Sequence, residues 1–232
     1  MSKTSTSLVL LLAAASLAGC ERAPKKPVFP QPERPVATII ASRFADEPVR
    51  DRAGEARRIF EIADVRAGMK VADIGAGEGY LSVRLAPLVG KDGRVLAEDI
   101  VPATRDALAQ RVERERLDNI AVRLGTPDDP LLPAHSFDRI FMIHMYHEIA
   151  QPYAFLWNIR PALVDGGQVV VVDVDRPTNE HGTPPALLAC EFASVGYRRV
   201  AHVELPASKA YLASFVPVGV RPEPAAIIPC KS

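Results

Sequence analysis

The regular alternation of strand-like and helix-like segments is the feature that most constrains the fold of this chain. Short apolar runs typical of strands are separated in most cases by segments with helical periodicity. We expect strands at 70–75, 93–100, 119–125, 137–145, 168–174, 197–205 and 210–218, and helices at 55–65, 80–89, 102–117, 152–164 and 184–196. This alternation predicts an α/β domain with a mostly parallel seven-stranded sheet and helices on both faces.

The end of the alternation predicts a reversal of strand direction. Only the polar stretch "PASK" separates the last two expected strands. A link this short favours a hairpin, so the last strand should run antiparallel. The chain has 232 residues, 48% of them hydrophobic, which suits one domain. We place that domain at 38–220 and treat 221–232 as a C-terminal tail.

Three glycines follow the first expected strand directly, in the stretch "VADIGAGEGY" at 71–80. Ligands of doubly wound sheets bind beyond the carboxyl ends of the strands, and Gly75, Gly77 and Gly79 would let one lie against the backbone. The spacing G-x-G-x-G differs from the dinucleotide fingerprint G-x-G-x-x-G. Asp73 precedes the glycines, and an acid there argues against a phosphate and for a cationic group.

This stretch resembles motif I of the class I S-adenosylmethionine-dependent methyltransferases, whose pattern is (D/E)-x-G-x-G-x-G. The stretches "SFDRIFMIHMYHEI" and "LVDGGQVVVVDV" resemble the family's fourth and fifth strands, and the resemblance runs from about Arg50 to Val218. It implies a Rossmann-like methyltransferase fold with an antiparallel last strand. It also implies S-adenosyl-L-methionine as the cofactor, which carries an ammonium, a carboxylate and a sulfonium but no phosphate.

The resemblance also implies which motif I residues bind the cofactor. Gly75 and Gly77, with Ala76 between them, would lie under its methionyl part, and Gly79 completes the motif. Asp73 would hold the ammonium, directly or through water.

Acids later in the chain complete the implied cofactor site. The second strand ends in Glu98-Asp99-Ile100, and a carboxylate at such a strand end can take both ribose hydroxyls. Asp99 matches the family position, but Glu98 beside it leaves open which acid faces the ribose. By resemblance, Asp128 or Asp129 in the loop after the third strand would hold the adenine amino group.

The candidate catalytic residues lie at the tip of the fourth strand. Methyl transfer is an in-line displacement that needs alignment, and an acceptor that is a weak acid also needs a base. The candidates are His144, Tyr146, His147 and Glu148. We assign His147 as the base, because it follows the strand end where acceptors approach in this fold. The alternative is that His147 caps the next helix or orients a neighbour. His144 lies within the apolar strand, and we expect it to be a core histidine.

No metal, nucleic acid or covalent nucleophile is expected. His144, His147 and His181 are the histidines that could gather around an ion, but the His-x-x-His spacing differs from the helical H-E-x-x-H motif.

Asp173 and Asp175, at the end of the fifth strand, could line the acceptor site or belong to a turn. Lysine plus arginine equals aspartate plus glutamate, 28 of each, so no general field attracts nucleic acid.

The start of the chain resembles an export signal, and we expect it to lie outside the fold. Leu8 to Ala18 form an apolar run too short for a transmembrane helix, which needs roughly 20 residues. The sequence Leu17-Ala18-Gly19-Cys20 resembles a bacterial lipobox. We therefore expect 1–19 to be a lipoprotein signal peptide and Cys20 to carry a lipid anchor; the alternative is an ordinary signal peptide with a chance cysteine.

The residues after Cys20 bear on location and on redox state. Glu21 mildly favours the outer membrane for a periplasm-facing lipoprotein. The proline-rich stretch 20–37 predicts a stiff, extended linker. Cys190 and Cys230 could pair in an oxidising compartment, or Cys190 could remain a buried free thiol.

Two functions are compatible with these features. The first is a membrane-tethered methyltransferase acting on a small molecule, since no nucleic-acid module is appended. The second is a non-catalytic lipoprotein that reuses the fold to bind a ligand or partner, because the cofactor is made in the cytosol and fold does not determine function.

Overall fold

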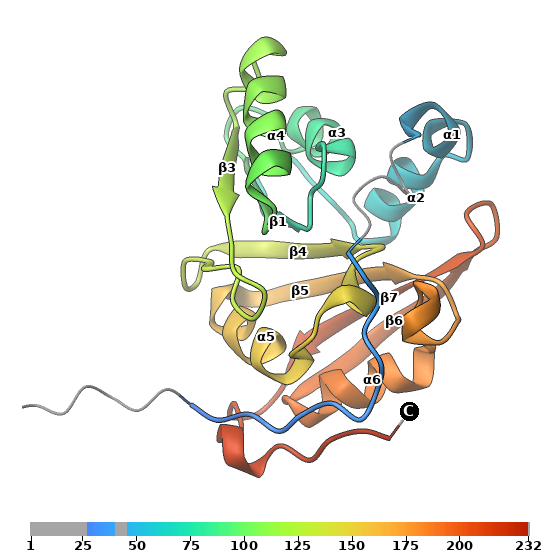
Figure 1. Cartoon of the computed structure of the whole chain (residues 1–232). Coiled ribbons are helices and arrows are strands. Elements are labelled where there is room, and N and C mark those ends of the chain that lie inside the picture. The colour runs from blue at the N-terminus through green and yellow to red at the C-terminus, as the bar shows by residue number, and fades with distance from the viewer. Residues whose placement is uncertain (1–26, 40–45, 232) are drawn as a thin grey trace, which may run out of the picture.

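The computed structural model describes residues 27–39 and 46–231 and contains one seven-stranded sheet (Figure 1). The strand order is β3-β2-β1-β4-β5-β7-β6. The strands are β1 (Lys70–Ile74), β2 (Arg94–Asp99), β3 (Ile120–Leu124), β4 (Phe137–Ile143), β5 (Leu163–Asp173), β6 (Tyr197–Leu205) and β7 (Ala210–Pro217). β7 is antiparallel to both neighbours, β5 and β6, and the other pairings are parallel, which confirms the predicted sheet.

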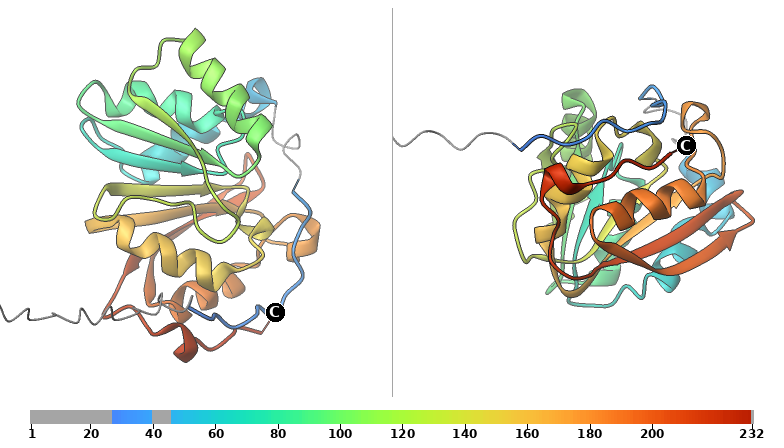
Figure 2. Two further views of the ribbon diagram at one scale, coloured as in Figure 1. Left: turned by 60° about the vertical axis from the view of Figure 1, so that its left-hand side comes forward. Right: turned by 90° about the horizontal axis from the view of Figure 1, so that it is seen from below.

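Helices cover both faces of the sheet (Figure 2). The α-helices are α1 (Glu47–Arg52), α2 (Glu55–Ile62), α3 (Tyr80–Val89), α4 (Pro102–Arg114), α5 (Pro152–Ile159) and α6 (Pro185–Ser194). Short 3-10 helices are η1 (Tyr146–Glu148), η2 (Arg160–Ala162), η3 (Thr178–Glu180) and η4 (Pro224–Ala226). Within β5, Val169 and Val171 pack with α5 and α6, whereas Val170 and Val172 pack with α2 and α3. A strand buried on both faces explains the unbroken valine run.

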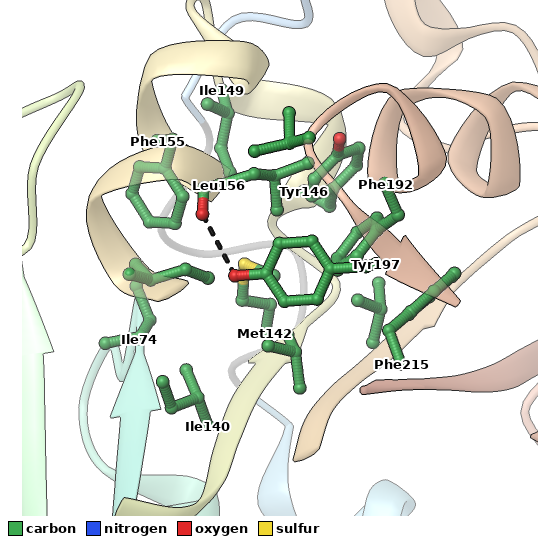
Figure 3. Packing of buried hydrophobic residues seen from close by; sticks show 14 of the residues in the cluster. Ile74, Ile140, Met142, Tyr146, Ile149, Phe155, Leu156, Phe192, Tyr197 and Phe215 are labelled. Carbon is green, nitrogen blue, oxygen red and sulfur yellow. Dashed lines mark hydrogen bonds between the residues drawn. The ribbon is translucent and has the colours of Figure 1, made fainter. Parts of the chain in front are cut away.

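The core on the α5 and α6 side is rich in aromatic residues (Figure 3). Phe192 of α6 stacks on Phe215 of β7, with ring centroids 3.8 Å apart. The buried Tyr197 hydroxyl donates a hydrogen bond to the Leu156 carbonyl at 3.0 Å. Each fully buried aromatic or aliphatic side chain contributes about 1.5–3 kcal/mol, so this layer fixes α5 and α6 against the sheet.

The structure corrects the expected boundary between α5 and β5. The helix expected at 152–164 ends at Ile159, because Pro161 has no backbone N–H to continue the ladder. β5 then begins at Leu163, and its register against β4 shifts near this end. Gly166 and Gly167, which lie between the expected helix and the expected strand, are therefore inside β5. Helix α1 was not expected at all.

The described part of the proline-rich segment packs on the domain. Arg34 is buried, and its Nε donates to the Glu191 carboxylate at 2.8 Å. Further along, the Ala37 N–H donates to the His147 carbonyl at 3.2 Å. The segment runs beside the C-terminal tail (Figure 2), and an isolated parallel β-bridge pairs Glu33 with Lys231 of that tail. This part of the expected linker therefore follows the domain surface and does not stand away from it, because Arg34 has a buried anionic partner there.

The remainder of the N-terminal predictions lies outside the described residues. This applies to the signal peptide at 1–19, to Cys20 and to residues 20–26 of the expected linker. Within the described ranges, no helix combines the length and the apolar character needed to span a bilayer.

A disulfide fixes the C-terminal tail to α6. Cys190 and Cys230 are bonded, so Cys190 is not a free thiol. The Cys230 N–H also donates to the Tyr153 hydroxyl at 2.7 Å, and the Trp157 indole donates to the Pro222 carbonyl at 2.9 Å. The tail consequently wraps across α5 and α6.

Candidate functional site

A cavity of about 250 Å³ opens at the carboxyl ends of β1, β2 and β4, where ligands bind in open α/β sheets. Carboxylates outnumber cationic side chains in its wall. Among the described residues of the wall, the acidic ones are Glu47, Glu78, Glu98, Asp99 and Glu148, and Arg50 is the one arginine. Apolar side chains, including Ile74, Ile143, Met145, Ile149 and Phe155, form the rest of the wall. Such a cavity suits a ligand with an apolar body and positive charge.

The motif I glycines have different roles. Gly77 has φ +56°, and a Cβ added to it would meet no atom of the described residues within 4 Å, so its main chain faces open space in this part of the structure. Its N–H donates to Asp99 Oδ2 at 3.0 Å. Gly79 has φ +90°, and a Cβ there would lie 2.4 Å from Leu108 Cδ1 of α4. Gly75, Ala76 and Gly77 line the cavity, whereas Gly79 allows α3 and α4 to pack closely.

Both acids at the end of β2 reach the cavity, together with Ile100. Asp99 is 8% exposed, and Oδ1 accepts the Val101 N–H at 2.8 Å while Oδ2 accepts the Gly77 N–H. These two bonds hold the carboxylate and the glycine loop in one fixed arrangement.

Glu98 is the more deeply buried of the two acids, at 1% exposed. It is wedged against Gly125, where a Cβ would lie only 1.6 Å from Glu98 Oε1. That oxygen has no hydrogen-bond partner among the described residues. Burial, reinforced by the nearby Asp99 charge, raises the pKa of Glu98 to about 8. A protonated Glu98 can donate a hydrogen bond as well as accept one.

Asp73 lies behind the cavity wall. It is 2% exposed, and Oδ2 accepts the Ser82 hydroxyl at 2.6 Å, which joins β1 to α3. Burial raises the pKa of Asp73 to about 6, although the Ser82 bond opposes the rise. The structure thus gives Asp73 a positioning role for α3 and does not bring it into the wall where it was expected to meet the ammonium.

The acid expected to hold adenine also lies outside the wall. Asp128 is exposed, and its side chain accepts a bond from the Thr126 hydroxyl at 3.2 Å. Its neighbour Pro127 lines the cavity in its place. The β3–β4 loop therefore reaches the site, but through an apolar ring and not through the predicted carboxylate.

Sequence reasoning missed a cationic group from α1. Arg50 lines the cavity, lies 3.6 Å from the centre of the Tyr80 ring, and pairs with Glu55 at 3.0 Å. His144 Nε2 contacts the same Glu55 carboxylate at 2.8 Å. Burial alone would raise the pKa of Glu55, but the hydrogen bonds from His144 and Arg50 lower it to about 2. The ionised Glu55 consequently positions both groups at the cavity edge. Arg50 carries no motif around it that would have indicated this role.

The expected base, His147, is not in the cavity wall. It is 1% exposed, and Nδ1 contacts both oxygens of Asp173 at 3.0 and 3.1 Å. The Asp173 carboxylate therefore fixes this ring beside the cavity, and the base role stays a prediction. Of the four candidates at the β4 tip, His144 and Glu148 line the cavity.

His147 belongs to a second cluster beside the cavity. One ligand-type atom from each of His147, Glu148 and His181 lies within 4.8 Å of the other two. The rings of His147 and His181 meet edge to face, with centroids 5.5 Å apart. His144, which the sequence grouped with these histidines, is bonded to Glu55 instead.

Known proteins resemble this chain over its central region. The profile of a methyltransferase domain family matches residues 71–167. Nocamycin O-methyltransferase of Saccharothrix syringae is 40% identical over 84 residues, which cover 36% of this chain and 30% of that protein. A protein-L-isoaspartate O-methyltransferase of Methanothrix thermoacetophila is 26% identical over 157 residues, or 65% of this chain and 69% of that protein.

A solved structure extends the likeness to the fold. A SAM-dependent methyltransferase from Aquifex aeolicus has a TM-score of 0.71 and 21% identity, covering 77% of this chain and 98% of that one. The fold is therefore the Rossmann-like methyltransferase fold. The profile and the relatives are those of methyltransferases and match part of this chain, and this likeness implies S-adenosylmethionine as cofactor. The match to the nocamycin enzyme spans less than a third of that protein's length.

The residues around the cavity fit this cofactor. Gly77 leaves space for a ligand against the main chain, and Glu98 presents a buried oxygen that has no hydrogen-bond partner within 27–39 and 46–231. The acid-rich wall matches the ammonium and sulfonium charges, and Arg50 offers a partner for a carboxylate.

Proposed function

We propose that this chain is an S-adenosylmethionine-dependent methyltransferase that acts on a small-molecule acceptor. The observation that carries the proposal is the arrangement of Asp99 around Gly77. The carboxylate lies in the cavity wall and is held by two backbone N–H groups, at the strand end where a nucleoside ribose would bind.

Each wall group has a defined task in this proposal. Asp99 accepts hydrogen bonds from the ribose hydroxyls, and protonated Glu98 beside it supplies a further donor. The main chain of Gly75 and Gly77 lies against the methionyl part, and Arg50 pairs with its carboxylate. When bound, S-adenosylmethionine supplies an electrophilic methyl group for transfer.

The remaining wall suits an acceptor of small size. Ile143, Met145, Ile149 and Phe155 are apolar and limit water, which favours an aligned displacement. His144 and Glu148 are the titratable groups of the β4 tip that lie in the wall, so either can serve an acceptor that must lose a proton. The balanced net charge supports a small molecule over nucleic acid.

We also propose that the domain is tethered to a bacterial membrane on its periplasmic side, through a lipid on Cys20. The apolar run that ends in Leu17-Ala18-Gly19-Cys20 supports this, and the Cys190–Cys230 disulfide is compatible with an oxidising compartment. The variant Cys20→Ser should move the protein from the membrane fraction to the soluble fraction. Unchanged membrane recovery would reject the anchor.

Calorimetry on the full-length chain in detergent tests the enzymatic proposal before any acceptor is known. We expect one binding site for S-adenosylmethionine and for its demethylated product, with thermal stabilisation by both. Absence of both effects would reject the methyltransferase proposal and favour the non-catalytic lipoprotein that uses the fold to bind another ligand.

A further inference from the structure

We propose that His147, Glu148 and His181 form a binding site for a divalent transition metal, with zinc as the ion best matched to the ligand set. Two imidazoles and one carboxylate, with a further position left for water or another donor, make up a common catalytic zinc site. The three ligand-type atoms already lie within 4.8 Å of one another. Movements of about an ångström would bring them to the separations of about 3.3 Å that zinc-ligand distances near 2.05 Å require.

The orientation of His147 supports a ligand role. Its Nδ1 faces the Asp173 carboxylate at 3.0 Å, so the neutral ring donates from Nδ1 and carries its lone pair on Nε2. A carboxylate that orients a histidine in this way is typical of metal sites, where it fixes the tautomer and raises the basicity of the ligand. Asp173 is itself fixed by the Thr183 hydroxyl at 2.7 Å and by the Val174 N–H at 2.8 Å.

The loop that carries His181 is held in place. The Thr183 N–H donates to the Val174 carbonyl at 2.8 Å, and the Tyr211 hydroxyl donates to the Thr183 carbonyl at 2.6 Å. Gly182 has no room for a side chain, because a Cβ would lie 2.4 Å from the Val174 carbonyl oxygen. A ligand on a fixed loop loses little entropy on binding, which favours a preorganised site.

Glu148 places the metal site beside the cofactor cavity. It is half-buried and lines the cavity, whereas its neighbour on the same 3-10 helix, His147, is buried and does not line it. A metal bound here would make His147 a ligand through Nε2, and the ring could not then act as a general base.

Zinc titration of the full-length chain tests the proposal without any cofactor. The chain must carry no histidine tag and must first be stripped of metal with a chelator. We expect one zinc ion per chain, and His181→Ala and Glu148→Gln should each weaken binding more than tenfold. The matched control is His202→Ala, an exposed histidine on β6, which should leave zinc affinity unchanged.

X-ray absorption at the zinc edge identifies the ligands independently of affinity. We expect a shell of nitrogen and oxygen at about 2.0–2.1 Å that includes imidazole. No uptake of zinc, uptake unaffected by His181→Ala, or sulfur in the shell would overturn the proposal. Circular dichroism of the metal-free His181→Ala variant checks that it is folded like the wild type. If it is not, the zinc affinity of Glu148→Gln tests the proposal in its place.

This test is separable from that of the methyltransferase proposal. Titration of the metal-free chain with S-adenosylmethionine examines Asp99 and the glycine loop, whereas zinc titration examines His147 and Glu148 on η1 and His181 directly after η3. Either result can fail while the other holds.

Discussion

Replacing Glu98 with glutamine should remove a pH-dependent loss of stability. Glu98 has a folded-state pKa of about 8, raised by burial from the ordinary value of 4.5. An acid whose pKa is raised on folding stabilises the native state fully below its unfolded pKa. That contribution is lost as the pH rises through the folded pKa.

The size of the effect follows from these two values. Between about pH 4.5 and pH 8 the native state holds one proton more than the unfolded state at this site. Stability therefore falls by about 1.4 kcal/mol per pH unit. From pH 5 to pH 7 the loss assigned to Glu98 is about 2.5 kcal/mol, and a glutamine of nearly the same shape has no such loss.

Urea unfolding at pH 5 and pH 7 measures this difference, with the disulfide kept oxidised. The fall in the free energy of unfolding should be about 2.5 kcal/mol smaller in Glu98→Gln than in wild type. Glu78→Gln is the matched control, because Glu78 is exposed in the same cavity wall and its substitution should not change the fall. Equal falls in wild type and Glu98→Gln would refute a buried, protonated Glu98.

Three further predictions address the site and the scaffold. Asp99→Ala should weaken S-adenosylmethionine binding more than tenfold by calorimetry. Asp128→Ala should change the affinity less than twofold, because Asp128 lies outside the cavity wall, and a larger loss in Asp128→Ala than in Asp99→Ala would contradict the role given to Asp99. Gly79→Ala should lower the free energy of unfolding in urea by about 1–3 kcal/mol more than Gly68→Ala does. Both glycines have positive φ, but only a side chain at Gly79 would collide with α4, so equal losses would contradict this reasoning. Reducing the disulfide, which spans 40 residues, should lower the free energy of unfolding by about 4 kcal/mol in the chain-entropy account, and an unchanged midpoint would oppose it.

The sheet could be predicted from sequence because its signals are local. Each strand carries its own apolar run, and the short link before Ala210 fixed the direction of β7. The glycines and Asp99 that line the cavity could be predicted for the same reason, since one strand end and one turn define each of them. Pro161 was a local signal as well, and it explains why the helix ends before the predicted position.

The residues that were missed, or that lie elsewhere than expected, depend on contacts between distant segments. Arg50 reaches the cavity from α1, a helix of only six residues whose start is marked by the Asp46 cap that accepts the Val49 N–H and by a proline in the first turn. His147 follows the strand end as predicted, but Asp173 from the next strand decides which way its ring points. Burial of Asp73 behind the wall likewise depends on the packing of α3, which no spacing within the motif encodes.

A crystal structure with S-adenosylhomocysteine bound to the full-length chain tests the central claim most directly. We predict the nucleoside in the cavity, with both ribose hydroxyls within hydrogen-bond distance of Asp99 and the homocysteine part against Gly75 and Gly77. Crystals grown with saturating ligand that show Asp99 without a ribose contact, or the nucleoside bound elsewhere, would contradict the account.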